Sequence, residues 1–335
     1  MKSFKLKLKL NICTRGVFIT ENRRGLKPFE PDLVDTSVGK CVEPNINMSN
    51  GLFYFESVIY DSFTLRNFPS EGCVFFSLIF FIRRFTMAKT VLVTGASRGL
   101  GSVIARTLVA KGFQVVINYN QSQTAAEQLM QELGTQTIAL QADVRNREQV
   151  NAMVASAIDH FGHIDAVVNN ALVNFKFDPD AQKSFKDLSW DDYQAQLDGT
   201  LKASFNVIQS VLPQFIEHKQ GSVVNIGTNL YQNPVVPYHE YTTAKASIIG
   251  FTRNIAAELG QYGITANVVS GGLLKTTDAS AVTTPEVFDL IASTTPLHQV
   301  TSPQDVANMV VYLCSDEAKQ ITGQNITVDG GLTMN

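Results

Sequence analysis

The sequence predicts a doubly wound α/β fold, in which a parallel sheet of seven strands carries helices on both faces. Two observations lead to this prediction. From Met87 onward, short β-branched runs alternate with longer helical patterns, and polar residues or glycines bound the short runs as they bound buried parallel strands. Strand and helix in alternation imply right-handed crossovers, with ligands at the carboxyl ends of the strands. Residues 87–335 also have a suitable length for one such domain.

The seven expected strands are short and mostly β-branched. No internal repeat or low-complexity tract interrupts them. In chain order they cover residues 90–93, 115–117, 138–140, 166–168, 222–226, 265–269 and 325–328.

The expected helices lie between these strands. Ser189, followed three residues later by Asp192, forms a capping box at the start of one helix, and Gly260 ends another. A shorter helix is expected to begin at Pro285 after the cap residue Thr284. Its apolar residues form either a mobile lid or ordinary amphipathic packing. The longer helices cover residues 101–111, 125–133, 147–161, 190–216, 241–259 and 303–313.

Residues 1–86 differ from the rest of the chain. They hold 12 of the 21 phenylalanines and three of the four cysteines, and they show no sustained alternation or helical period. Their most apolar run, residues 73–82, is shorter than the roughly 20 residues that cross a bilayer. With the two arginines that follow, this run could act as a weak membrane-surface anchor. We favour another interpretation, in which Met87 is the biological start and residues 1–86 are an upstream extension without a fold of their own.

Charge and cysteine spacing exclude several classes of partner. The chain carries 27 Lys and Arg against 30 Asp and Glu, and the excess of acid lies after Met87. A net-acidic body lacks the positive surface that phosphate-backbone binding needs, so we expect no nucleic-acid partner. The four cysteines are far apart, which argues against a disulfide framework and favours a reducing, cytoplasmic location.

We also predict no metal site. His160 and His163 have no Cys or carboxylate ligands at metal spacing. We expect a helix N-terminus, rather than a pair of acid/base carboxylates, at Asp187, Asp191 and Asp192. These residues follow the capping pattern, and their negative charges interact favourably with the positive end of the helix dipole.

The segment after the first expected strand has the pattern of a phosphate-binding loop. It reads Thr-Gly-Ala-Ser-Arg-Gly-Leu-Gly over residues 94–101 and runs directly into a helix. Gly95 permits a tight turn, Gly99 lets the backbone approach a pyrophosphate, and Gly101 lets helix and strand pack closely. A plain glycine-rich turn is the alternative, but the position between the first strand and the first helix favours a dinucleotide site in a Rossmann fold. The cofactor-binding residues expected here are Gly95, Ser97, Arg98, Gly99, Leu100 and Gly101.

The residues after the second expected strand favour NADP(H) over NAD(H). An NAD site usually places a carboxylate on the ribose 2′-hydroxyl about 20 residues after the glycine loop. Residues 117–122, which include the expected cofactor-binding residue Asn120, contain no acid. A carboxylate repels a 2′-phosphate, whereas a guanidinium binds it, and Arg98 supplies one within the loop. The alternative is that Arg98 merely covers the loop in solvent.

A tyrosine, a lysine and a hydroxyl suggest the chemistry. Tyr241 and Lys245 are four residues apart, so they share one helical face, and Thr228 ends the strand before that helix. An ammonium about 4 Å from a phenolate contributes ~4 kcal/mol at an effective dielectric of ~20, which lowers the phenol pKa by about three units. This arrangement suits hydride transfer to a carbonyl carbon: Tyr241 protonates the oxygen, Thr228 hydrogen-bonds it, and Lys245 lowers the tyrosine pKa and holds the nicotinamide ribose. Alone, such a pair is usually an exposed helix pair, but the dinucleotide loop favours the catalytic interpretation.

At this point the chain resembles the short-chain dehydrogenase/reductase family over nearly all of residues 87–335. Within that family it looks most like the 3-oxoacyl-[acyl-carrier-protein] reductases, which reduce a β-keto thioester with NADPH. The resemblance implies that Asp143 and Val144 lie near the adenine, Asn170 near the cofactor ribose and Thr276 near the nicotinamide amide. It also implies a homotetramer. The matching segments are residues 94–101, 143–144, 169–171, 241 with 245, 321–324 and 328–331.

Four positions depart from the family pattern. Thr228 stands for the usual catalytic serine and keeps its hydroxyl. Thr200 stands where an asparagine usually supports a proton relay, Leu172 replaces a glycine, and residues 271–272 are Gly-Gly in place of Pro-Gly. Two alternative functions therefore remain: reduction or oxidation of another ketone or alcohol, and a catalytically weakened NADP(H)-binding sensor.

Overall fold

The computed structural model describes residues 88–334, except 173, 174, 176, 179–181, 276, 278, 279 and 282, together with four short strands within the first 87 residues. The chain divides into two compact units, Met1–Phe80 and Phe81–Asn335. In the first unit, β1 (Leu8–Cys13) pairs antiparallel with β2 (Gly16–Glu21), and β3 (Asn47–Ser49) pairs antiparallel with β4 (Leu52–Tyr54). The sequence analysis expected no strand there. That residues 1–86 lack a fold of their own, with one domain over 87–335, stays a prediction.

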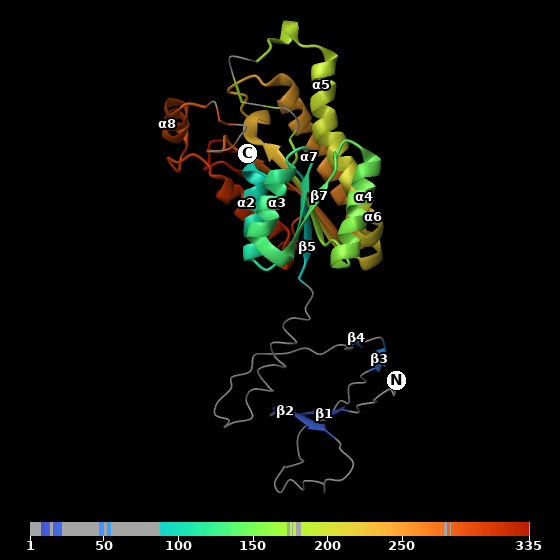
Figure 1. Ribbon diagram of the computed structural model, residues 1–335. Helices are drawn as coiled ribbons and strands as arrows, with labels where there is room; N and C mark the ends of the chain where they lie inside the picture. The colour runs from blue at the N-terminus through green and yellow to red at the C-terminus, as the bar shows by residue number, and fades with distance from the viewer. Residues whose placement is uncertain are drawn as a thin grey trace. The chain divides into compact units, whose positions relative to one another are not determined.

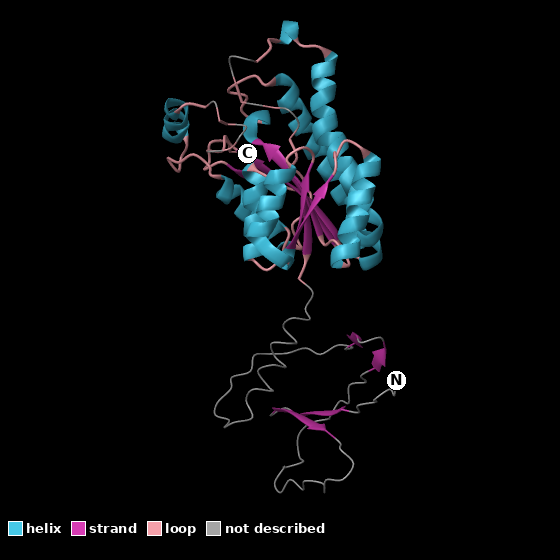
Figure 2. Cartoon of the chain, in the orientation of Figure 1, coloured by secondary structure: helices cyan, strands magenta, loops and turns pink. Residues whose placement is uncertain are grey.

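The described part of the second unit contains the predicted seven-stranded parallel sheet (Figures 1 and 2). Its strand order is β11-β10-β9-β8-β5-β6-β7. The chain therefore builds outward from β5 to β7 and returns to the other side of β5, which leaves a switch point between β5 and β8. The strands are β5 (Thr90–Val93), β6 (Gln114–Tyr119), β7 (Thr137–Gln141), β8 (Ala166–Asn169), β9 (Gly221–Thr228), β10 (Ile264–Gly271) and β11 (Asn325–Val328).

Helices cover both faces of this sheet, with α2 and α3 on one side and α4 and α6 on the other (Figure 1). In the described residues no helix is both long and apolar enough to cross a bilayer. The α-helices are α2 (Gly99–Ala110), α3 (Gln123–Leu133), α4 (Arg147–Phe161), α5 (Trp190–Leu197), α6 (Ala203–His218), α7 (His239–Leu259), α8 (Pro285–Thr294) and α9 (Pro303–Leu313). Short 3₁₀ turns are η1 (Gly134–Gln136), η2 (Phe185–Asp187), η4 (Asn229–Tyr231), η5 (Gly260–Tyr262) and η6 (Asp316–Ala318).

One predicted helix is divided in the structure. The single helix expected over residues 190–216 is instead α5, a π-helical segment η3 (Asp198–Lys202), and α6. Gly199 lies inside this segment and has a low helix propensity, which favours a break in the regular hydrogen-bond ladder. Single π turns inside helices occur frequently at functional sites. The predicted capping box of Ser189 and Asp192 is confirmed at the start of α5.

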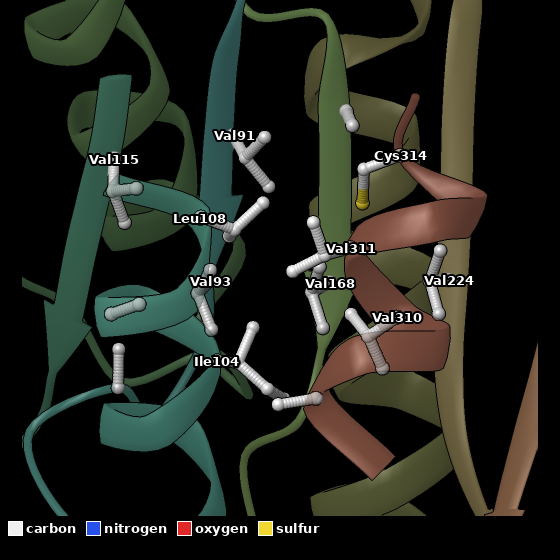
Figure 3. Packing of buried hydrophobic residues seen from close by; sticks show 14 of the residues in the cluster. Val91, Val93, Ile104, Leu108, Val115, Val168, Val224, Val310, Val311 and Cys314 are labelled. Atoms are coloured by element: carbon white, nitrogen blue, oxygen red, sulfur yellow. The ribbon is translucent and has the colours of Figure 1, made fainter. Parts of the chain in front are cut away.

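The alternation of side chains along β5 explains the two-sided core. Val91 and Val93 face α2 and α9, whereas Leu92 belongs to the cluster beneath α4, α6 and α7. Figure 3 shows the first face, where Ile104 and Leu108 of α2 point toward the β5 valines. A strand buried on both faces contains a continuous apolar run, as residues 91–93 are.

Strand register brings the carboxyl ends of β8, β9 and β10 to one edge. Asn169 pairs with Asn225, and Gly271 pairs with Thr228, in adjacent parallel strands. Val93 at the end of β5 pairs with Val168 of β8. The residues that follow these four strands therefore lie at the same edge of the sheet.

Candidate active site

The glycine turn after β5 has the geometry that a pyrophosphate needs. Gly95 and Gly99 have φ of +61° and +55°, in the left-handed region that favours glycine. A Cβ on Gly95 would lie 2.9 Å from Ala171 Cα, and one on Gly101 would lie 2.6 Å from Asn170 Nδ2. A Cβ on Gly99 would meet nothing within 4 Å, so that side of the turn is open. The turn runs into the N-terminus of α2, and these residues fit a dinucleotide phosphate.

Two asparagines hold this turn in place. Asn118 in β6 accepts a hydrogen bond from Gly95 N (3.1 Å) at its side-chain oxygen and donates to Ala142 O (3.1 Å). Asn170 donates through Nδ2 to Thr94 O (2.9 Å) and to Gly95 O (3.1 Å). The structure thus gives Asn170 a role in fixing the loop, and its contact with the cofactor ribose stays a prediction. The sequence analysis missed Asn118, although a polar residue inside a buried strand needs such partners.

The other predicted cofactor residues lie around the same edge. Arg98 is exposed and precedes α2, and Asn120 is exposed directly after β6. Asp143 forms an ion pair with Arg145 (2.7 Å), and the hydrogen bonds from that guanidinium lower the Asp143 pKa. Val144 is buried. Ser97 and Leu100, both half-buried, belong to the turn, and Thr276 lies outside the described residues.

The three predicted catalytic side chains come together, as their spacing indicated. Tyr241 and Lys245 in α7 are both 5% exposed, and Thr228 at the end of β9 is 6% exposed. The Thr228 and Tyr241 side chains share a hydrogen bond. Lys245 Nζ lies 6.0 Å from the centroid of the Tyr241 ring and donates to Ile226 O at 2.7 Å. The phenol of Tyr241, the hydroxyl of Thr228 and the buried ammonium of Lys245 therefore lie close together at the carboxyl end of β9.

The predicted acidity of Tyr241 is wrong for this structure. Burial raises the pKa of Tyr241 to about 12, against a smaller lowering effect of the Thr228 hydrogen bond. Burial also lowers the pKa of Lys245 to about 8. Loss of water therefore sets the direction of the Tyr241 pKa, and Lys245 Nζ bonds to a main-chain carbonyl rather than to the phenol. The spacing of Tyr241 and Lys245 in the sequence does not predict how deeply the two side chains are buried.

Aromatic rings cause part of this burial, and the sequence analysis did not single them out. Phe175 stacks on the Tyr241 ring with centroids 4.2 Å apart and planes 14° apart. Phe177 meets the same ring edge-on at 5.4 Å, and Phe175 meets Tyr238 edge-on at 5.2 Å. The two phenylalanines lie in the loop after β8, shortly after Leu172. Their distance from Tyr241 depends on the course of this loop, which no short-range pattern in the sequence predicts.

The departures from the family pattern occupy different surroundings. Thr200 is buried within η3, and its main-chain carbonyl accepts from Ser204 Oγ at 2.8 Å. Leu172 is 37% exposed. A Cβ on Gly272 would lie 3.2 Å from Asp329 Cβ, which is tight, whereas on Gly271 the nearest atom would be 3.4 Å away.

A cleft lies beside the predicted helix α8, which begins at Pro285 as expected. Its volume is about 530 Å³. Phe288 lines it, so one apolar side chain of α8 faces this space, while Val287 is 42% exposed. The two interpretations of α8, a mobile lid and ordinary amphipathic packing, stay predictions. The cleft is lined by Lys275, Thr277, Ser280, Ala281, Thr283, Pro285, Phe288 and Asp289.

His163 and Asp192, which lie outside this site, have structural partners. His163 Nε2 lies 3.1 Å from Asp165 Oδ2. Asp192 caps α5 and pairs with Lys183 at 2.8 Å, in line with the helix-terminus interpretation. Among the described residues, no three His, Cys, Asp or Glu side chains are grouped for a metal ion.

Comparison with known proteins agrees with this geometry. A family model described as "Enoyl-(Acyl carrier protein) reductase" matches residues 95–333. The chain is 36% identical over 251 residues to the 3-oxoacyl-[acyl-carrier-protein] reductase FabG of Staphylococcus aureus strain Mu50, covering 74% of this chain and 99% of the relative. It is 35% identical over 253 residues to the 3-oxoacyl-[acyl-carrier-protein] reductase of a Synechocystis species, covering 74% and 98%. It is 32% identical over 247 residues to the reductase FabG of Aquifex aeolicus, covering 73% and 97%.

The matched region contains the glycine turn, the hydroxyl pair and the buried lysine. The protein is an oxidoreductase that acts on CH–OH or C=O groups. The chain belongs to the short-chain dehydrogenase/reductase family.

Proposed function

We propose that this protein reduces the ketone of a 3-oxoacyl thioester, carried on an acyl carrier protein, to the alcohol with NADPH. One observation carries the proposal: two hydroxyls, from Thr228 and Tyr241, hydrogen-bond to each other beside the buried Lys245. Two hydroxyls that converge can both bind one carbonyl oxygen, which needs a proton when it becomes an alkoxide. The substrate class comes from the three relatives, which are 3-oxoacyl-[acyl-carrier-protein] reductases.

The residues of the site suit the reductive direction. With a pKa of about 12, the Tyr241 phenol keeps its proton at neutral pH and is ready to donate it to an alkoxide. Thr228 stabilises the same oxygen by a hydrogen bond, as an oxyanion-hole donor does. Lys245, held by Ile226 O, keeps a positive charge near the phenolate that Tyr241 becomes. When bound, NADP(H) supplies the hydride.

The preference for NADPH over NADH rests on two features of the chain. Residues 114–122 carry no carboxylate that could accept a ribose 2′-hydroxyl or repel a 2′-phosphate. Arg98 is exposed at the start of α2, where a guanidinium can bind a phosphate through two hydrogen bonds. We therefore propose Arg98 as the residue that selects the phosphorylated nucleotide.

Several further parts of the proposal rest on the family resemblance alone. They are the adenine contacts of Asp143 and Val144, the ribose contact of Asn170, the nicotinamide contact of Thr276 and a homotetrameric assembly. We also propose a cytoplasmic location, which the wide spacing of the cysteines favours. The cleft beside α8, of about 530 Å³, is large enough for an acyl chain, and we propose it as the acyl site.

A substrate panel tests the function. The full chain is mixed with NADPH and, in separate reactions, with a 3-oxoacyl thioester, an unrelated ketone, a 2-enoyl thioester or no substrate, and the loss of NADPH absorbance is followed. We expect turnover with the 3-oxoacyl thioester. Turnover restricted to the unrelated ketone or to the enoyl thioester would overturn the substrate assignment. NADPH binding without turnover on any carbonyl would support a sensor instead.

A further inference from the structure

A buried carboxylate that the proposed proton transfer does not use lies directly after β11. Asp329 is 4% exposed, and burial of a carboxylate is costly unless its oxygens accept hydrogen bonds. Among the described residues its donors are neutral groups. Oδ1 accepts from Gly331 N (3.0 Å), and Oδ2 accepts from Thr333 N (2.9 Å), Thr333 Oγ1 (2.7 Å) and Asn229 Nδ2 (3.0 Å). The Asp329 carboxylate thus joins groups from two separate segments of the chain.

Two of the three partner residues belong to the turn that Asp329 itself begins. Gly330 and Gly331 have φ of +70° and +86°, in the left-handed region, so the main chain can turn back and direct two N–H groups toward the carboxylate. The third partner, Asn229, lies 100 residues earlier and directly follows Thr228. The carboxylate therefore links the C-terminal segment to the neighbour of a proposed catalytic residue.

The same C-terminal segment also holds the other end of η4. Asn325, at the start of β11, donates through Nδ2 to the Tyr231 hydroxyl (2.9 Å), and its side-chain oxygen accepts from Ser270 Oγ (2.7 Å). Asn229 and Tyr231 are the first and last residues of η4. Side chains at the two ends of β11 thus bond to both ends of this short turn.

The middle of η4 contacts the hydroxyl of Thr228. Leu230 N donates to Thr228 Oγ1 at 3.3 Å. A hydroxyl has one hydrogen and two lone pairs, so this bond occupies a lone pair and restricts the direction in which the hydrogen can point. The hydrogen bond between Thr228 and Tyr241 acts to lower the pKa of Tyr241 against the larger effect of burial, as expected of a hydroxyl that donates to the phenolate. The position of η4 therefore helps to decide where the Thr228 hydrogen points.

We propose that Asp329 is a positioning residue of the active site, because its bond to Asn229 holds η4 in place. With η4 in place, Leu230 N stays on Thr228 Oγ1, and the Thr228 hydroxyl keeps its hydrogen directed at the reacting oxygen. Asp329 acts through Asn229 and donates nothing to the substrate itself. This inference rests on the proposed function, since it concerns the orientation of the same hydroxyl.

Substitution of Asn229 tests the link. Asn229→Leu removes the bond to Asp329 with little change in side-chain volume. Its rate of hydride transfer, measured in single turnovers with NADPH and a 3-oxoacyl thioester, should fall about fivefold to tenfold, because η4 loses a hydrogen bond to a charged group. NADPH affinity should stay within about twofold of the parent, since the glycine turn is untouched. Asn229→Ala takes the place of Asn229→Leu if the larger side chain prevents folding.

The matched control is Thr333→Val. It removes a donor from the same carboxylate and leaves the Asn229 bond in place. Its hydride-transfer rate should stay within about twofold of the parent. An equal loss of rate in Thr333→Val and Asn229→Leu would overturn the proposal.

A double-mutant cycle with Thr228→Val separates positioning from a general loss of structure. Thr228→Val has no hydroxyl to orient, so the further change Asn229→Leu should lower its rate by less than about twofold. If the two losses multiply in the double variant, the effect of Asn229 does not pass through the Thr228 hydroxyl, and Asp329 is not a positioning residue.

A second readout does not depend on catalysis. Crystal structures of the full chain should show Asn229 Nδ2 on Asp329 Oδ2 and Leu230 N on Thr228 Oγ1 in the parent, and Leu230 N beyond hydrogen-bond distance in Asn229→Leu. A parent without the bond between Asn229 and Asp329 would refute the proposal even if the variants fail to fold, and so would a variant in which Leu230 N has not moved. A parent that shows both bonds but turns over no carbonyl would disprove the proposed function and leave this link intact.

Discussion

Substitution of Gly101 by alanine tests whether the turn after β5 must have its observed shape to bind the cofactor. In α2, Gly→Ala alone should stabilise the helix by about 0.8–1 kcal/mol. Here the added Cβ would lie 2.6 Å from Asn170 Nδ2 and 2.9 Å from Ala96 Cα, distances that real Cβ atoms essentially never show, and it would also collide with the Gly95 carbonyl oxygen. Two of these three neighbours are backbone of the turn itself, so relief of the clash requires the turn to shift.

The expected result has two parts. Overpacking of this kind typically costs about 1–3 kcal/mol, so the net free energy of unfolding should fall by up to about 2 kcal/mol. Displacement of the turn should also weaken NADPH binding by about tenfold to a hundredfold, because each tenfold loss corresponds to about 1.4 kcal/mol of misplaced phosphate contacts. Denaturant unfolding and a fluorescence titration with NADPH measure the two quantities.

Gly260→Ala is the matched control. Gly260 ends α7 with φ of −55°, and a Cβ there would meet nothing within 4 Å. Its stability and NADPH affinity should stay close to those of the parent. A Gly101→Ala protein that binds NADPH as tightly as the parent would show that the close approach of helix and turn is not needed, and would refute the fit between this turn and the phosphate.

Three further predictions concern the other parts of the site. Thr228→Ser should keep most of the turnover, whereas Thr228→Val should lower kcat about 10²–10³-fold, as loss of an oxyanion-hole donor does; equal rates in steady-state assays of the two variants would exclude a role for the hydroxyl. Arg98→Ala should raise KM for NADPH about tenfold or more and leave KM for NADH unchanged, since charge-assisted hydrogen bonds contribute about 1.5–3 kcal/mol; a parallel rise for both nucleotides would contradict selection by Arg98. Lys245→Met should abolish turnover yet stabilise the fold near neutral pH, because the folded pKa of about 8 lies below the usual 10.5. The unfolded chain then binds more protons between these two values, so wild-type stability should gain up to about 3 kcal/mol as pH rises from 8 to 10.5. Denaturant unfolding from pH 7 to 10 should show the stability of the two proteins converging, and a constant difference would argue against a buried ammonium.

The sheet and the cofactor turn could be predicted because their signals are local. The apolar run of residues 91–93 and the glycines at 95, 99 and 101 depend on neighbours within a few residues. The pairing of Tyr241 with Lys245 follows from helix geometry alone, and the structure confirms their shared position. The same is true of the capping box at Ser189.

The remaining features depend on contacts between distant segments. The pKa of the Tyr241 phenol is raised rather than lowered because the side chain is buried, in part by Phe175, more than sixty residues earlier in the chain. The side-chain oxygen of Asn169 is buried without a hydrogen bond, because the amide nitrogen of the same side chain donates to Asn225 in the next strand. Tertiary packing decides each of these, so short-range patterns cannot report them.

The central claim is that the Tyr241 hydroxyl supplies the proton in a site that binds NADPH through separate residues. Tyr241→Phe removes that oxygen and keeps the ring that stacks on Phe175. Single-turnover measurements of NADPH oxidation with a 3-oxoacyl thioester, made beside a titration of NADPH binding, test the claim directly. We expect the hydride-transfer rate to fall by at least about a hundredfold, with nucleotide affinity within about twofold of the parent. A variant that oxidises NADPH at the parent rate would contradict the account.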